Sequence, residues 1–222
     1  GLTAPTEGEP VALAFLAAGV QAFVLDYSVA PDRWPQSFLE AASAVAWVRA
    51  HAADYGVAPD RIAVCGFSAG GHLACQYSNR YNCPEIRNVF PESKPVHKAI
   101  LCYPVITAEE RYKHVGTMHN FVGHDPISPQ EKGCACELLV TENTPPTFLW
   151  HTSEDEGVPV ENSLIYASAL SAKKVPFELH IYPYGWHGLA TADKLTCTGL
   201  DEKLAHVHEW IEDCKKWLKL TN

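Results

Sequence analysis

Short apolar runs alternate along this chain with segments whose apolar residues recur at helical spacing. The runs with strand character are Val20–Tyr27, Arg61–Gly66, Lys98–Val105, Thr147–Thr152 and Val175–Tyr184. The segments with helical spacing or helix-ending residues are Pro10–Ala18, Ser37–Tyr55, Ala69–Tyr81, Val160–Lys173 and Asp201–Leu220. Strands that alternate with helices predict an α/β fold, in which a mostly parallel sheet is flanked by helices.

One long segment breaks this alternation. Residues 107–146 are irregular and rich in His, Pro, Glu and Cys. No repeat, low-complexity tract or linker divides the chain, so we expect a single domain over residues 1–222. Residues 107–146 are then expected to form a cap-like insertion above the site.

Composition excludes several classes of function. The chain has 222 residues, of which 47% are hydrophobic, and 17 basic against 26 acidic residues give a formal charge of −9. An acidic chain without a basic stripe is a poor candidate for binding nucleic acid or anionic membranes. No apolar run has membrane-spanning length and no signal-peptide pattern is present, and the eight cysteines show no regular spacing. We therefore expect a reducing, cytoplasmic location, with secretion as the alternative because this sequence need not begin at the natural N-terminus.

Gly66-Phe67-Ser68-Ala69-Gly70 has the pattern G-x-S-x-G. It follows an expected strand and opens an expected helix, which is the context in which this pattern marks a nucleophilic serine. The backbone N–H of Ala69 would face a developing oxyanion at the helix N-terminus. A glycine- and serine-rich turn without chemistry is the alternative interpretation.

A nucleophilic serine needs a base and an orienting acid. Asp155 follows the expected strand Thr147–Thr152, where an acid would lie at the catalytic edge of the sheet, and Glu154 and Glu156 are its rivals. Of the eleven histidines, only His187 lies between the last strand and the last helix. We predict that Ser68 acts with His187 and with one of these three loop acids.

Three further stretches carry a family resemblance. GFSAGGHLA at residues 66–74, TPPTFLWHTSEDEGVPVENSL at 144–164 and PFELHIYPYGWHGL at 176–189 together resemble bacterial esterases and lipases of the α/β-hydrolase superfamily. Within this superfamily the chain resembles the acetyl-xylan-esterase-like group, also described as endo-1,4-β-xylanase-like or BD-type esterases. The resemblance implies an α/β-hydrolase fold, a Ser68–His187–Asp155 triad, and hydrolysis of short acyl esters, including acetyl groups on sugars.

The chain departs from that group at its start. Members of the group begin with a hairpin, a central strand and a glycine-rich loop that supplies a second oxyanion N–H. Here Gly1 stands where that loop would end, so Gly1 is the candidate for this donor. The N-terminal strands are expected to be missing, including the one between the strands at Val20 and Arg61.

Other candidate residues have weaker patterns. Phe67 and Trp186 flank Ser68 and His187 and are candidates for substrate contact. His114, His119 and His124 recur every five residues, which fits neither one helix face nor a usual zinc pattern. We expect no metal and no cofactor. The expected partner is a small-molecule ester, and the oligomeric state, including a homo-oligomer, stays open.

Two other function classes remain. One is a different enzyme on the same fold, such as a peptidase of the prolyl-oligopeptidase type or a formamidase, because a fold does not fix a substrate. The other is an inactive hydrolase-like fragment, which the expected loss of N-terminal strands favours. Esters, amides and peptides offered side by side would separate these classes.

Overall fold

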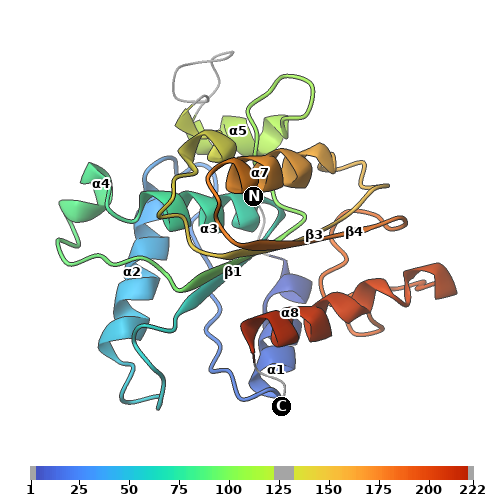
Figure 1. Ribbon diagram of the computed structural model, residues 1–222, viewed down its shortest axis with the longest axis horizontal. Coiled ribbons are helices and arrows are strands. Elements are labelled where there is room, and N and C mark those ends of the chain that lie inside the picture. The colour runs from blue at the N-terminus through green and yellow to red at the C-terminus, as the bar shows by residue number, and fades with distance from the viewer. Residues whose placement is uncertain (1–3, 123–132, 220–222) are drawn as a thin grey trace.

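A four-stranded parallel sheet forms the centre of the protein (Figure 1). The computed structural model describes residues 4–122 and 133–219. The strands lie side by side in chain order: β1 (Ala63–Phe67), β2 (Lys98–Cys102), β3 (Thr147–Thr152) and β4 (Phe177–Tyr182). All neighbours pair in parallel, so the carboxyl ends of the four strands lie along one edge.

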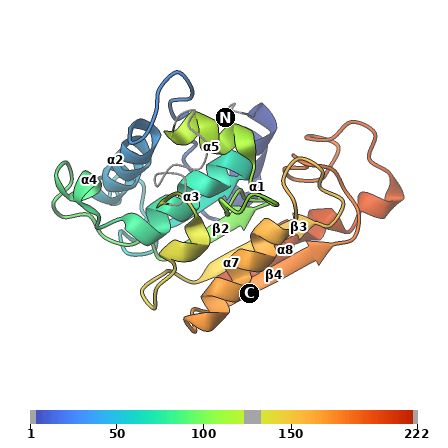
Figure 2. The ribbon, with the colours of Figure 1, turned by 90° about the horizontal axis from the view of Figure 1, so that it is seen from above.

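Helices cover both faces of the sheet (Figures 1 and 2). On one face lie α3 (Ser68–Arg80) and α7 (Glu161–Ala172), and α2 (Gln36–Ala50) packs beside α3. On the other face lie α1 (Glu9–Leu16) and α8 (Trp210–Leu218). The shorter elements are α4 (Pro84–Arg87), α5 (Val115–Val122), η1 (Pro5–Glu7), η2 (Cys136–Leu139), η3 (Glu202–Leu204) and η4 (Val207–Glu209).

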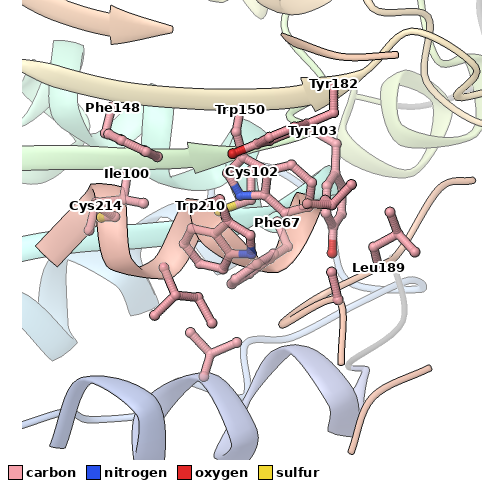
Figure 3. Packing of buried hydrophobic residues seen from close by; sticks show 14 of the residues in the cluster. Phe67, Ile100, Cys102, Tyr103, Phe148, Trp150, Tyr182, Leu189, Trp210 and Cys214 are labelled. Atoms are coloured by element: carbon pink, nitrogen blue, oxygen red, sulfur yellow. The ribbon is translucent and has the colours of Figure 1, made fainter. Parts of the chain in front are cut away.

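The core under α8 is built from aromatic rings (Figure 3). The rings of Trp150 on β3 and Trp210 on α8 stack with centroids 5.2 Å apart. The ring of Tyr103, directly after β2, meets Trp150 edge-on at 4.9 Å. Such pairs stabilise a fold by about 1 kcal/mol each beyond their buried area. They fix the carboxyl end of β3, from which the functional loop continues.

The prediction of a strand at Val20–Tyr27 is wrong. Residues 20–29 form no strand, and Phe23, Val24 and Leu25 are exposed. Apolar, β-branched residues favour a strand only when a neighbouring strand takes up their backbone hydrogen bonds and covers their side chains. Among the described residues no strand lies beside this segment.

An open cleft of about 2030 Å³ lies between this segment and the free edge of β1. Its walls include Val24, Trp47 on α2, Cys65 on β1, and Ser68 at the start of α3. No described segment fills the position between residues 20–27 and β1, where a strand is expected to be missing.

The predictions for the other strands and helices agree better with the structure. The other four strands and the helices at α1, α2, α3 and α7 are confirmed within a few residues at their ends. The long helix expected at Asp201–Leu220 is instead two 3₁₀ turns followed by α8. Residues 107–146 contain α5 and η2, and their role as a cap within one domain stays a prediction. None of the described helices is long and apolar enough to cross a membrane.

The cleft predicts one reactive thiol. Cys65 on β1 is exposed, whereas Cys75, Cys102 and Cys214 are buried. Since thiol modification requires access, a thiol-reactive dye should modify Cys65 first under native conditions. Peptide mass spectrometry should find the first label there, and C65S should remove the fast phase while C83S, a change at a half-buried thiol, should keep it. A native protein whose Cys65 reacts no faster than its buried thiols would contradict an open cleft.

Candidate active site

Ser68 lies at the turn that joins β1 directly to α3. β1 ends at Phe67, α3 begins at Ser68, and the backbone of Ser68 is left-handed with φ +51°. Residues other than glycine rarely adopt this backbone conformation, so contacts with neighbouring residues must hold the backbone of Ser68 in place. Two glycines make the turn sterically feasible: a Cβ on Gly66 would lie 2.3 Å from the carbonyl oxygen of Gly70, and one on Gly71 would lie 2.8 Å from Cβ of Pro104.

The turn also exposes backbone donors. The first N–H groups of any α-helix have no acceptor within the helix, and the helix dipole makes this end positive. The N–H of Ala69 belongs to the first turn of α3, next to the Ser68 hydroxyl. The carbonyl of Ser68 accepts a hydrogen bond from the N–H of Val105, which ties the turn to the chain after β2.

The structure brings Ser68, His187 and Asp155 into one hydrogen-bonded chain. Ser68 Oγ lies 2.7 Å from His187 Nε2, and His187 Nδ1 lies 2.7 Å from Asp155 Oδ2. Asp155 follows β3 and His187 follows β4. Since parallel strands end at the same edge, the three side chains meet there although 119 residues separate Ser68 from His187.

The Asp155 carboxylate is enclosed by hydrogen-bond donors. Oδ1 accepts from the N–H groups of Gly157 and Val158, each at 2.8 Å, and Oδ2 lies 3.3 Å from His151 Nε2 in addition to His187. Burial raises the pKa of Asp155, but the hydrogen bonds from His151, His187 and Val158 outweigh burial and lower the pKa well below its ordinary value. The carboxylate is therefore charged at neutral pH.

The ring of His187 is confined from two sides. A Cβ on Gly157 would lie 2.9 Å from both Cβ and Cγ of His187, so the loop after β3 fits here only because residue 157 is glycine. On another side the Tyr103 ring meets the imidazole edge-on, with centroids 5.1 Å apart. The ring stays partly open to solvent, as a group that exchanges protons with a substrate must be.

Sequence reasoning missed two residues beside this site. The Tyr103 hydroxyl donates to Glu7 Oε1 at 2.8 Å and accepts from the N–H of Ala190 at 3.0 Å. Burial raises the pKa of Glu7, and the Tyr103 hydrogen bond and nearby His187 partly offset this. In the sequence Tyr103 lies inside the expected strand Lys98–Val105 and Glu7 is an acid before the first expected helix, so no local pattern marks either residue.

The rival acids have other surroundings. Glu154 Oε2 accepts a long, 3.4 Å hydrogen bond from the N–H of Gly185, which links the loops after β3 and β4. Glu156 is exposed. Of the three neighbouring acids, Asp155 is the one that hydrogen-bonds His187.

The predicted substrate contacts differ in exposure. Trp186 is 46% exposed beside His187, and its contact with substrate stays a prediction. Phe67 is 7% exposed, with its ring against Tyr103 and Trp210, so the ring belongs to the core and a substrate contact for it is untested. Gly1 lies outside the described residues.

Among the residues that the structure describes, the histidines spaced five residues apart do not form a metal site. His114 Nδ1 lies 2.8 Å from the Thr117 hydroxyl, and burial lowers its pKa. Residues 4–122 and 133–219, which include His119, contain no group of three His, Cys, Asp or Glu side chains placed to hold a metal ion. His124 lies outside the described residues.

Comparison with known proteins places this geometry in a family. The family described as BD-FAE matches residues 4–170. The chain belongs to the BD-FAE family. Endo-1,4-beta-xylanase B of Butyrivibrio fibrisolvens is 36% identical to this BD-FAE chain over 196 residues, which cover 84% of the chain and 30% of the relative. The acetylxylan esterase of Xylanibacter ruminicola is 30% identical over 162 residues, which cover 71% of the chain and 30% of the relative.

A solved structure agrees over nearly the whole BD-FAE chain. The acetyl ester-xyloside bifunctional hydrolase from Caldicellulosiruptor lactoaceticus is 39% identical, with a TM-score of 0.84, over 97% of this chain and 77% of that one. This similarity, with the helix-flanked parallel sheet, confirms the expected α/β-hydrolase fold. The chain spans only about a third of the length of the two curated relatives named above.

The contact between Gly157 and His187 predicts the effect of a single methyl group. G157A places a Cβ 2.9 Å from two atoms of His187 and should push the ring away from Ser68. A displacement near 1 Å lowers kcat by on the order of tenfold to a hundredfold. G133A is the matched control, because a Cβ there meets nothing within 4 Å. Equal kcat for the two folded variants in an ester assay would contradict this account.

Proposed function

We propose that this BD-FAE chain hydrolyses carboxylic esters, with Ser68 as nucleophile, His187 as general base and Asp155 as the orienting acid. The observation that carries the proposal is the unbroken hydrogen-bond chain from Ser68 Oγ through His187 to Asp155. This arrangement is the one that serine acyl-transfer enzymes use on several unrelated folds.

The geometry supports a two-step acyl transfer. Nε2 of His187 removes the Ser68 proton as Oγ attacks the ester carbonyl, and Asp155 stabilises the resulting imidazolium. The N–H of Ala69 hydrogen-bonds the oxygen of the tetrahedral intermediate. His187 then donates its proton to the departing alcohol. Water, activated by His187, attacks the acyl-enzyme in the same way and releases the acid.

The proposed substrate is a short acyl ester, chiefly an acetyl ester, carried on a carbohydrate. Support comes from the acetylxylan esterase and the acetyl ester-xyloside hydrolase among the similar proteins. The exposed ring of Trp186 beside His187 offers an apolar face of the kind that packs against a sugar ring or an acyl chain. Every proposed step uses only groups of this chain and water, so no cofactor enters the proposal.

The open cleft bears on the rate. Its walls include Ser68, Ala69 and His187, so the free edge of β1 opens directly beside the reacting atoms. A second oxyanion donor, predicted at Gly1, lies outside the described residues. Loss of one such donor lowers kcat by about a hundredfold to a thousandfold. The proposal is therefore tested by the dependence of the rate on Ser68 and not by the absolute rate.

Replacement of the nucleophile tests the proposed function. S68A should reduce hydrolysis of p-nitrophenyl acetate by about three orders of magnitude or more. S78A is the matched control, because Ser78 is on the same helix and its hydroxyl donates to the Ala74 carbonyl instead of contacting His187. Initial rates should be compared at equal folded concentration, with amide and peptide substrates in parallel. Equal activity of S68A and the native chain would refute the assignment, and faster turnover of an amide or peptide would indicate the alternative enzyme classes.

A further inference from the structure

A second histidine lies behind the acid of the proposed triad. His151 is on β3, four residues before Asp155, and its side chain is completely buried. Its Nε2 lies 3.3 Å from Asp155 Oδ2, the same oxygen that accepts from His187 at 2.7 Å. Two imidazole rings therefore meet one carboxylate oxygen, and only His187 also contacts Ser68.

The neighbours of His151 determine which ring nitrogen carries the proton. Nε2 lies 2.9 Å from the carbonyl oxygen of Val158, which can only accept, so Nε2 must be the donor. In the neutral ring Nδ1 is then an acceptor, and the Ser163 hydroxyl, 2.8 Å away, donates to it. The Nε2–H group donates to the Val158 carbonyl, and Asp155 Oδ2 lies beside this N–H, 3.3 Å from Nε2.

The residue that orients the His151 ring, Ser163, belongs to α7. Ser163 is on the third position of α7 and is completely buried, so its hydroxyl is held where it meets the His151 ring. Trp150, the residue before His151, faces the opposite side of the sheet and packs against α8. β3 is thereby fixed from both faces at the residues that carry this contact.

We propose that His151, oriented by Ser163, is a positioning residue for the ester hydrolysis proposed above. Its Nε2–H holds Oδ2 of Asp155 in line with His187 Nδ1 and takes up part of the negative charge on that oxygen. This inference rests on the proposed function. The inference adds His151 and Ser163 as residues that position Asp155 and do not contact substrate.

The charges around the site give the direction of the effect. Asp155 and Glu7 are the acids beside His187, the buried Tyr103 packs against its ring, and His114 is a further titratable group on that side. Without the His151 donor, Oδ2 keeps more of its charge and attracts the imidazolium form of His187 more strongly. The acid limb of kcat/KM against pH should then move to higher pH.

Three variants separate positioning from packing. H151L removes both ring nitrogens at similar volume, H151Q keeps an N–H donor, and S163A removes the group that orients the ring. H180L is the control, since His180 is a strand histidine on β4 bonded to Glu178. In H151L the acid limb should rise by about half a pH unit, because the 3.3 Å contact is long and the same N–H donates to the Val158 carbonyl. Its kcat should fall several-fold with little change in KM, S163A should shift the limb in the same direction, and H151Q and H180L should resemble the native chain.

A profile of H151L that superimposes on the native one at equal folded concentration would overturn the proposal, as would equal effects of H151L and H151Q. If H151L does not fold, S163A and H151Q carry the same comparison. The proton NMR signal of His187 Nδ1–H separates this inference from the proposed function, since it requires no turnover. The signal should shift in H151L or S163A but not in H180L, even if S68A and the native chain prove equally inactive. An unchanged signal would overturn the proposal.

Discussion

The site depends on how the carboxylate of Asp155 is held. Four donors converge on it from the loop after β3, from β3 itself and from the loop after β4. A buried carboxylate without such partners would take up a proton, because desolvation strongly disfavours its charge. With them it stays charged and fixes the ring of His187, so the proposed chemistry at Ser68 rests on hydrogen bonds that Ser68 does not make.

The hydrophobic core positions these donors. Along β3 consecutive side chains point to opposite faces, so Trp150 packs against Trp210 on α8 while His151 reaches Ser163 on α7. A shift of β3 along its neighbours would break the aromatic packing and the contact to Asp155 together. The stability of this part of the fold and the geometry of the proposed site therefore depend on the same register.

Local sequence patterns predicted much of this structure. Short apolar runs predicted β1 to β4, and the glycines around Ser68 indicated the sharp turn that the structure shows. Asp155 could not be separated from Glu154 and Glu156 in the sequence, because the distinction depends on which carboxyl the N–H groups of Gly157 and Val158 reach.

The failures have a common cause. The segment Val20–Tyr27 has strand composition, yet a strand also needs a neighbour to pair with, and no described strand supplies it. Tyr103 and Glu7 are 96 residues apart in the chain, and no spacing rule joins such pairs. His151 likewise reads as one apolar-strand residue among six, because its role depends on α7 and on a loop carbonyl.

The central claim is that Ser68 is an activated nucleophile in this fold. Incubation of the folded chain with a serine-reactive fluorophosphonate, followed by peptide mass spectrometry, tests it most directly. The account predicts a single stoichiometric adduct on Ser68 that S68A lacks and that H187A forms much more slowly. A folded sample that forms no adduct, or one whose adduct lies on another serine, would contradict the account.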